Sequence, residues 1–150
     1  SPFDVHYNRA PIGGVVESTK QYPAVGRNRL MAAMQLRTLF RRRPMYAGSP
    51  HIIQNNRAVT RFSGALGGRD AWCYVVQIGS RGISGIDVYP RAGDTVERGA
   101  VFGMIRIGSQ VDLVAPARDG FEIAVREGQR VRAGESVLVR VTNPEPSPHA

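Results

Sequence analysis

Residues 57–80, "RAVTRFSGALGGRDAWCYVVQIGS", decide the fold that we expect for this chain. Apolar and polar side chains alternate on either side of Gly67-Gly68-Arg69-Asp70, as they do in two half-buried strands joined by a tight turn. Glycine supplies the positive φ that such turns require. The stretch therefore predicts a β-hairpin, and the chain from Asn56 onward is predicted to be β.

The residues before this hairpin predict two further strands and one helix. A strand is expected from Phe3 to Asn8, then a turn around Pro11 to Gly14, and then a second strand. Residues 27–43, "RNRLMAAMQLRTLFRRR", are good helix formers without glycine or proline, and Pro44 ends the run. Because apolar residues occupy more than one face, a helix buried on several sides is favoured over a basic helix on a membrane surface.

A glycine-turn unit occurs twice in the C-terminal half, as Gly93-x-x-Val96-x-x-Gly99 and as Gly128-x-x-Val131-x-x-Gly134. In each unit the glycines permit two bends and the valine is expected to fill the core between them. The match extends outward through three pairs of residues: Val88 and Ile123, Phe102 and Val137, Met104 and Val139. The unit resembles the half-repeat of biotinyl- and lipoyl-carrier domains, but residues 106–110 lack the lysine that would carry the cofactor.

These patterns predict a mainly β (α+β) fold for residues 1–150, taken as a single domain. We expect an antiparallel β sandwich with one inserted helix and a barrel-sandwich-hybrid-like (lipoyl/biotinyl-like) repeat in the C-terminal half. The Pro-rich residues 143–150 are expected to form a disordered tail. With 150 residues, 42% of them hydrophobic, the chain is large enough for one core.

Composition and charge limit the classes of function that we expect for this chain. No run approaches the roughly 20 apolar residues that cross a bilayer, and the start at Ser1 suggests a fragment rather than a natural N-terminus. The single cysteine, Cys73, excludes an internal disulfide, and the three separated histidines give no metal-ligand spacing. The net charge of +8 favours an anionic partner. Aromatic residues, at 7%, are not interleaved with a basic stripe, which argues against nucleic acid.

The stretch "FGMIRIGSQVDLVAP", residues 102–116, carries a resemblance to a known family. It is similar to the processing site of phosphatidylserine decarboxylases, in particular to the short bacterial and archaeal form, and meets its pattern FGMI-[RK]-[FI]-GS-x-VD-x-x-x-P. "SPFDVHYNRAPIGGVV" at the N-terminus resembles another block of the family, SP-x-DVH-x-NRAP. The family's aspartate block, which precedes the DVH block, has no counterpart here, and its "NER" block is matched only by Asn55-Asn56-Arg57, without the glutamate.

The resemblance implies a proenzyme that cuts itself between Gly108 and Ser109. The Ser109 hydroxyl would attack the Gly108 carbonyl, and elimination would leave a covalent pyruvoyl group on the new fragment. The products would be a β fragment, 1–108, and an α fragment, 109–150, which stay together as a heterodimer. The pyruvoyl carbonyl would react with the substrate amine and act as an electron sink when CO2 leaves.

The resemblance also implies the other site residues. His6 is the best candidate for the acid or base, with Asp4 on the same strand face to orient it, although a satisfied surface histidine is the alternative. Tyr7, Asn8 and Arg9 are candidate substrate-binding residues. Arg9 could bind a phosphate or carboxylate, or pair with Asp112. His51, in a stretch expected to be a loop, and His149 are weaker candidates.

The function implied is pyruvoyl-dependent decarboxylation of phosphatidylserine to phosphatidylethanolamine, in phospholipid biosynthesis. Such an enzyme would act peripherally at the cytoplasmic face of the cell membrane, on an anionic surface, with a homodimer as a further possibility. The alternatives are a pyruvoyl-dependent decarboxylase of a soluble amino acid and an unprocessed basic lipid-binding domain. No metal is expected.

Overall fold

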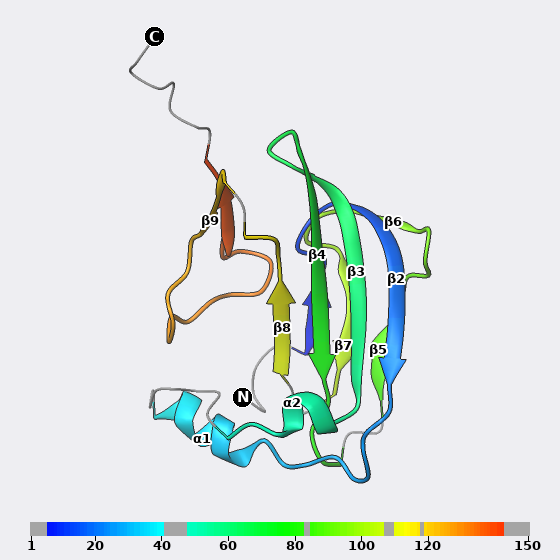
Figure 1. The fold of residues 1–150 in the computed structure, drawn as a ribbon, viewed down its shortest axis with the longest axis vertical. Coiled ribbons are helices and arrows are strands. Elements are labelled where there is room, and N and C mark those ends of the chain that lie inside the picture. The colour runs from blue at the N-terminus through cyan, green and yellow to red at the C-terminus, as the bar shows by residue number, and fades with distance from the viewer. Residues whose placement is uncertain (1–5, 41–47, 83–84, 107–109, 118, 143–150) are drawn as a thin grey trace.

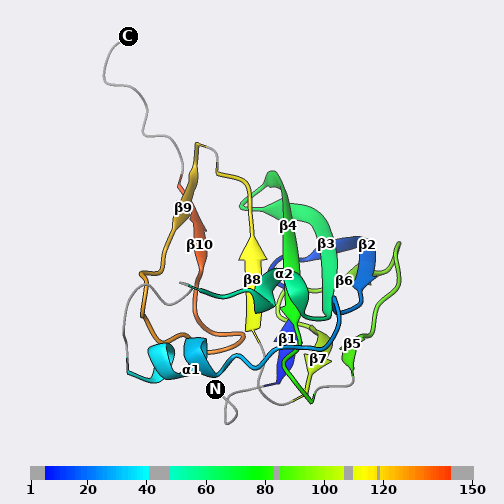
Figure 2. The same cartoon turned by 60° about the horizontal axis from the view of Figure 1, so that its bottom comes forward.

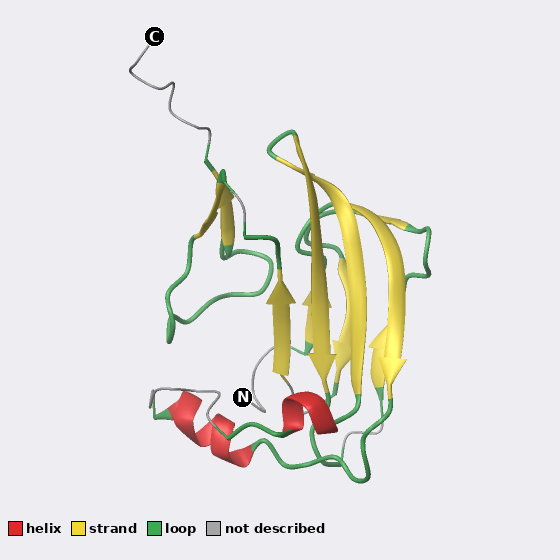
Figure 3. Cartoon of the chain, viewed as in Figure 1, coloured by secondary structure: helices red, strands yellow, loops and turns green. Residues whose placement is uncertain are grey.

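The computed structural model describes residues 6–40, 48–82, 85–106, 110–117 and 119–142. Antiparallel strands dominate these residues, with two short helices at one end (Figures 1 and 3). The expected mainly β fold is therefore confirmed. The tail at 143–150, Asp4, Gly108 and Ser109 lie outside the described residues.

The predicted hairpin is present and forms the centre of the larger sheet. Strands β3 (Arg57–Leu66) and β4 (Arg69–Ile78) pair antiparallel along their whole length. The turn between them consists of Gly67 and Gly68, whose φ angles are +60° and +75°. The two strands expose alternate side chains, so the period of two read from the sequence fixes which residues face the core.

Five strands make the larger sheet, in the order β6-β2-β3-β4-β8, and three make the smaller one, in the order β1-β7-β5. Their bounds are β1 Tyr7–Arg9, β2 Gly14–Tyr22, β5 Ile86–Val88, β6 Thr95–Val96, β7 Val101–Ile105 and β8 Gln110–Val114. Core residues come from both sheets, and the rings of Phe62 on β3 and Phe102 on β7 meet edge to face at 5.0 Å. This packing of β7 against β3 joins the two sheets.

The stretch that the sequence presents as one long strand is divided between the two sheets. β7 ends at Ile105 and pairs with β1 and β5, whereas β8 begins at Gln110 and pairs with β4. The alternation of apolar and polar residues along 101–116 therefore does not correspond to one continuous strand. The physical reason is that alternation reports only which side of a strand is buried, and both strands bury one side.

The helical segment is shorter and more exposed than predicted. Helix α1 spans Ala32–Leu39 instead of 27–43, and residues 27–31 are not helical. Met31, just before it, is buried, but Leu36 and Phe40 are 54% and 66% exposed, so a helix buried on several sides is wrong. A second helix, α2 (His51–Gln54), forms where a loop was expected. In the described part of the chain, no helix has the length and apolar character needed to span a bilayer.

The two glycine-turn units differ in the structure. The first runs through β5, β6 and β7, and Val96 packs against the core. The second lies between β9 (Phe121–Ile123) and β10 (Val139–Val141), which form a separate two-stranded ribbon beside the larger sheets (Figure 2). Val96 is half-buried against the core, as expected, whereas Val131 is 47% exposed, so the expectation that the valine fills the core is wrong for the second unit. The lipoyl-like arrangement of the C-terminal half stays a prediction.

Candidate active site

The smaller sheet brings the N-terminal block beside the strand that leads to Gly108. β1 pairs antiparallel with β7, with Tyr7 opposite Met104 and Asn8 opposite Gly103. The pairing continues one residue earlier, where the backbone N–H of Ile105 donates to the His6 carbonyl at 3.1 Å. His6 is half-buried there. Two segments almost 100 residues apart in the sequence therefore meet just before the predicted cleavage site.

A buried amide links this strand pair to the larger sheet. Gln77 on β4 is fully buried, and its Nε2 donates to Asn8 Oδ1 at 2.7 Å. The approach is close at Gly103, where a Cβ would come within 3.0 Å of Gln77 Nε2. Within the described residues, Gln77 Oε1 is buried without a hydrogen-bond partner. A buried free acceptor is costly in a folded protein and is common where a ligand or reacting group completes the bonding.

On the other side of the predicted cleavage site, Gln110 begins β8 and is buried. His51 Nε2 lies 2.9 Å from Gln110 Oε1, and Gln110 Nε2 donates to Asp112 Oδ1 at 2.6 Å. His51 is only 3% exposed. Because the amide oxygen of Gln110 is an acceptor, His51 Nε2 must carry the proton in this contact. The side chain of the residue next to Ser109 is thus held at both ends.

Asparagine side chains, of which Asn55 is buried and Asn28 and Asn56 are half-buried, fix helix α2, and with it His51. Asn55 is fully buried, and its Nδ2 donates to the carbonyls of Arg29 and Gly79, at 2.9 and 2.7 Å. The N–H of Arg29 donates in turn to Asn55 Oδ1 at 2.8 Å. Asn56 accepts from Asn28 Nδ2 at 2.7 Å. These bonds satisfy polar groups that would otherwise be buried unpaired, so the segment after α2 is rigidly placed.

The structure separates the predicted substrate-binding residues. Asn8 faces Gln77, whereas Tyr7 and Arg9 are exposed. Arg9 Nη1 donates to the Gly99 carbonyl at 2.8 Å, and the alternative ion pair with Asp112 is not formed. Asp112 instead accepts a hydrogen bond from the side chain of Gln110.

His51 is the residue that sequence reasoning undervalued. Its position after Pro50 suggested a loop, and nothing in the local pattern connects it to Gln110, 59 positions away. The available signal was weak: a histidine within an apolar run, "HIIQ", beside the Asn55-Asn56-Arg57 block. Among the described residues, no group of three or more His, Cys, Asp or Glu side chains could hold a metal ion.

The thiol of Cys73 is buried in the core, and its burial changes its pKa. Desolvation raises the pKa of the Cys73 thiol from 9.0 to about 12. Cys73 lies on β4 in the apolar core cluster, away from the polar residues described above. It is therefore a neutral packing residue at neutral pH and is not suited to act as a nucleophile.

The fold and this site together define a class of protein. It is an antiparallel β protein in which hydrogen-bonded polar side chains lie beside β7 and at the start of β8. Residues 1–139 match the family model described as phosphatidylserine decarboxylase. The chain therefore belongs to the phosphatidylserine decarboxylase family.

Curated relatives agree with this assignment. Over 142 residues, the chain is 37% identical to a Methanopyrus kandleri protein assigned to the archaetidylserine decarboxylase proenzymes, covering 94% of this chain and 56% of the relative. It is 32% identical to a phosphatidylserine decarboxylase proenzyme of Salinibacter ruber, covering 97% and 54%. It is 34% identical to that of Chlorobium limicola, covering 93% and 55%.

The chain spans about half the length of the curated relatives that it matches. No solved structure matches it significantly. The family is thus established from sequence, and the site geometry comes from this structure alone.

Proposed function

We propose that the protein is a pyruvoyl-dependent carboxy-lyase that converts phosphatidylserine to phosphatidylethanolamine after cutting itself between Gly108 and Ser109. The observation that carries the proposal is the pairing of β1 with β7. It brings His6 beside Ile105, on the strand that leads into the Gly-Ser pair. The names of the relatives, which are proenzymes of phosphatidylserine and archaetidylserine decarboxylases, support the same reaction.

In this proposal, His6 handles protons, with Asp4 as the residue that orients it. The hydroxyl of Ser109 is a weak nucleophile at its own pKa, so a base must remove its proton during attack on the Gly108 carbonyl. Glycine at position 108 leaves that carbonyl open. The peptide bond is replaced by an ester, and elimination then releases the Gly108 carboxylate. Hydrolysis with loss of ammonia leaves the keto group on the former Ser109.

The residues around Gln110 fit such a group. Gln110 is bonded covalently to residue 109, and His51 and Asp112 hold its side chain. On the inner side of the sheet, Gln77 Oε1 offers a buried acceptor without a partner in the described part of the chain. When present, the keto group supplies an electrophilic carbonyl that binds an amine and accepts the electron pair released with CO2.

The chain's own residues would then bind and orient the substrate. Asn8 Oδ1 already accepts from Gln77, which leaves its Nδ2 to donate to a substrate oxygen. We propose Tyr7 and Arg9 as further substrate contacts, with the Arg9 guanidinium kept in place by its bond to Gly99. His6 would return a proton to the carbon from which CO2 departs.

The two fragments would remain associated after scission. β8, at the start of the proposed α fragment, pairs with β4 through five residues, and Leu113 packs against the core cluster. The sheet hydrogen bonds and the shared core therefore survive the loss of one peptide bond. We propose a barrel-sandwich arrangement like that of lipoyl domains for the C-terminal half.

We propose peripheral action at an anionic membrane surface, specifically the cytoplasmic face of the cell membrane. The net charge of +8 supports attraction to anionic lipid. Helix α1 and the residue that follows it add exposed apolar side chains, Leu36 and Phe40, next to a basic sequence. Such a combination is typical of helices that lie at the membrane interface.

The test uses the natural full-length protein. Denaturing electrophoresis and intact-mass measurement should show two fragments that separate at Gly108–Ser109, the second with a blocked N-terminus. Ser109→Ala should remain one chain and release no CO2, while the control Ser136→Ala, in the segment before β10, should behave as wild type. An uncut wild-type protein that decarboxylates phosphatidylserine would contradict the proposal. Activity on free serine without detergent or vesicles would point to a soluble substrate instead.

A further inference from the structure

A cavity of about 530 Å³ lies beside the polar site, between the segment that precedes α1, the start of α2 and Arg81. Its volume is within the roughly 300–1,000 Å³ that is usual for small-molecule sites. Of the described candidate site residues, His51 lines it, whereas His6, Tyr7, Asn8 and Arg9 do not. Its lining combines basic, small and apolar side chains: Arg27, Asn28, Arg29, Leu30, Met31, Ala33, Met34, Gly48, Ser49, Pro50, His51 and Arg81.

The lining is strongly positive. Among the described residues that line it, three are arginines and none is aspartate or glutamate. Across the described residues, the ion pairs and side-chain hydrogen bonds do not involve the guanidinium groups of these arginines. Helix α1 begins at the cavity without a side-chain cap and without an acidic residue in its first turn, so its N-terminal N–H groups add positive potential. An anion is the ligand that this charge distribution favours.

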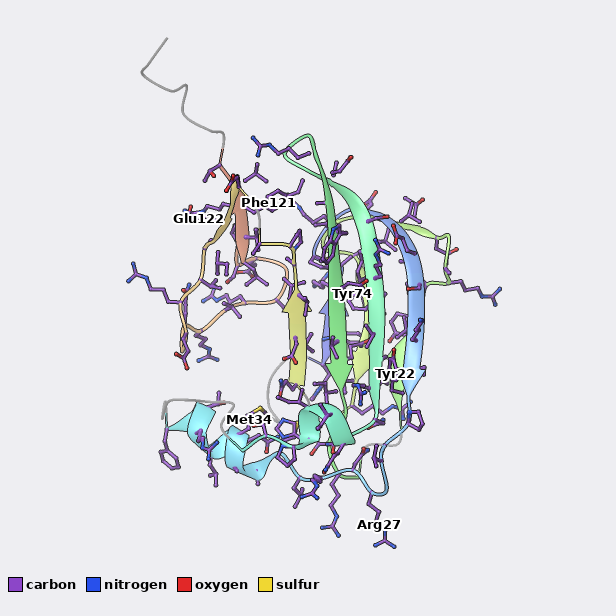
Figure 4. All side chains as sticks on the ribbon, in the orientation of Figure 1. Tyr22, Arg27, Met34, Tyr74, Phe121 and Glu122 are labelled. Atoms are coloured by element: carbon purple, nitrogen blue, oxygen red, sulfur yellow. The ribbon has the colours of Figure 1, made fainter. Side chains whose placement is uncertain are left out.

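Two of the arginines are held by their backbones. Both the N–H and the carbonyl of Arg29 bond to the buried Asn55 side chain, and the N–H of Arg81 donates to the Arg29 carbonyl at 3.3 Å. Their guanidinium groups therefore extend from neighbouring fixed points, and planar guanidinium forks suit the oxygens of a phosphate. Arg27 differs, since its side chain points away from the body of the molecule (Figure 4).

The cavity is connected to the candidate active site through His51. His51 lines the cavity, and its Nε2 bonds to the side chain of Gln110, the residue that follows Ser109. An anion bound by Arg29 and Arg81 is therefore separated from the predicted scission site by one histidine and one glutamine. This proximity distinguishes the cavity from an unrelated surface basic patch.

Exposed apolar side chains lie in the cavity lining and on or against α2, whose first residue lines the cavity; we call Leu30, Ile53 and Val25 the apolar rim. Leu30, in its lining, is 61% exposed, and Ile53 on α2 is 66% exposed. Val25, 74% exposed, lies against α2 because its N–H donates to the Gln54 carbonyl at 2.8 Å. An amphipathic ligand can use both features, whereas a free inorganic anion gains nothing from the apolar rim.

We infer that this cavity binds the phosphodiester headgroup of a membrane lipid, with Arg29 and Arg81 holding the phosphate and the acyl chains leaving over the apolar rim. The inference rests on the proposed function for the identity of the headgroup. It adds a substrate-binding site on the α2 side of the larger sheet, separate from Tyr7, Asn8 and Arg9.

The test measures binding to the full-length protein carrying Ser109→Ala, so that nothing is turned over. Calorimetry with glycerophosphoserine, inorganic phosphate and free serine separates the phosphodiester from its parts. Flotation with phosphatidylcholine vesicles, with or without phosphatidylserine, adds the lipid. The variants are Arg29→Gln, Arg81→Gln and their combination. Arg91→Gln, an exposed arginine outside the cavity, makes the same charge change as a control.

We expect each cavity variant to bind glycerophosphoserine at least about tenfold more weakly, because a charge-assisted bidentate contact is lost. Arg91→Gln should bind as the parent does. Equal weakening by Arg91→Gln, or unchanged binding by the double variant, would overturn the inference. So would inorganic phosphate binding as tightly as glycerophosphoserine.

Failure of this inference is distinguishable from failure of the proposed function. Scission is measured separately, on protein that retains Ser109. If that protein cuts itself and decarboxylates while the cavity variants bind normally, only the cavity assignment is wrong. If the protein stays uncut and inactive while the cavity variants lose binding, the cavity is correct and the proposed reaction is wrong.

Discussion

The two flanks of the predicted scission site, Arg106 and Gln110, have opposite environments. Arg106 follows β7, and its side chain is 63% exposed, with a long ion pair of 3.9 Å to Asp87. Gln110 begins β8 and is buried, with its amide bonded to both His51 and Asp112. One side of the segment is therefore solvated, and the other is fixed by a buried hydrogen-bond chain.

The difference suggests that the residues after the scission site must be held in place, whereas those before it need not be. The prosthetic group would remain on residue 109, so the backbone after it should be held firmly for catalysis. The carboxylate of Gly108 is only the leaving group of the elimination and takes no part in the later reaction. The fixed position of Gln110 and the solvated position of Arg106 agree with this difference. Substitutions at each flank test it.

His51→Ala should have the largest effect. Removing the imidazole leaves the buried oxygen of Gln110 unpaired, which costs about 1–3 kcal/mol of folding free energy. We expect self-cleavage to slow by about tenfold, equivalent to about 1.4 kcal/mol of barrier. The half-time of fragment appearance on denaturing gels measures it.

Two further substitutions sharpen this test. His51→Gln retains an N–H donor and should restore part of the rate, whereas Ile53→Ala, on the exposed side of the same helix, should change little. If His51→Ala lowers stability but leaves the scission rate normal, His51 only supports the fold.

Asp112→Ala should have a smaller effect. It removes the acceptor for Gln110 Nε2, a half-buried contact that is worth about 1 kcal/mol. We expect a slowing of scission by a few-fold at most and a reduced free energy of unfolding in urea. Asp112→Asn retains an acceptor oxygen and serves as the control. A larger defect for Asp112→Ala than for His51→Ala would reverse the order proposed here.

Arg106→Gln should change little. The contact to Asp87 is long and exposed at both ends, and such surface pairs contribute about 0–1 kcal/mol. Scission and thermal unfolding should match wild type within error. A loss as large as that of His51→Ala would break the contrast between the two flanks.

The buried thiol of Cys73 reports on the core, and we expect neither flank of the scission site to affect it. Its thiol pKa is raised to about 12 by burial, so the folded protein keeps the proton in the range where the unfolded chain, near 9, loses it. This contribution to stability is complete below pH 9 and falls as the pH rises toward 12. Cys73→Ala should make the alkaline decrease in unfolding free energy shallower. In the native protein, a thiol reagent should label Cys73 slowly, both before and after scission.

The sequence was most informative where a pattern is local. Alternation over residues 57–80 and the glycine pair at its centre predict β3 and β4 almost residue by residue. The glycines of both turn units have positive φ, as their spacing implies. Where the pattern depends on neighbours, prediction failed: Val96 and Val131 occupy equivalent positions, yet only the first packs against the core.

The site divides in the same way. Each of the FGMI-x-x-GS and DVH-x-NR blocks is an unbroken stretch of sequence. Residues 6–9 and 102–109 could therefore be chosen as candidate site residues without a structure. The contacts of Gln77 with Asn8 and of His51 with Gln110 join residues 69 and 59 positions apart. Nothing in a single sequence encodes such pairings, because they arise when separate strands and loops pack together.

The order of residues along the chain is enough to predict the β character, the hairpin at the centre of the larger sheet and the family to which the chain belongs. The division of residues 101–114 between two sheets and the contact of His51 with Gln110 become visible only in the folded chain. The physical reason is that the period of a strand records whether a side chain is buried. The identity of the neighbour that buries it is fixed only when the sheets pack.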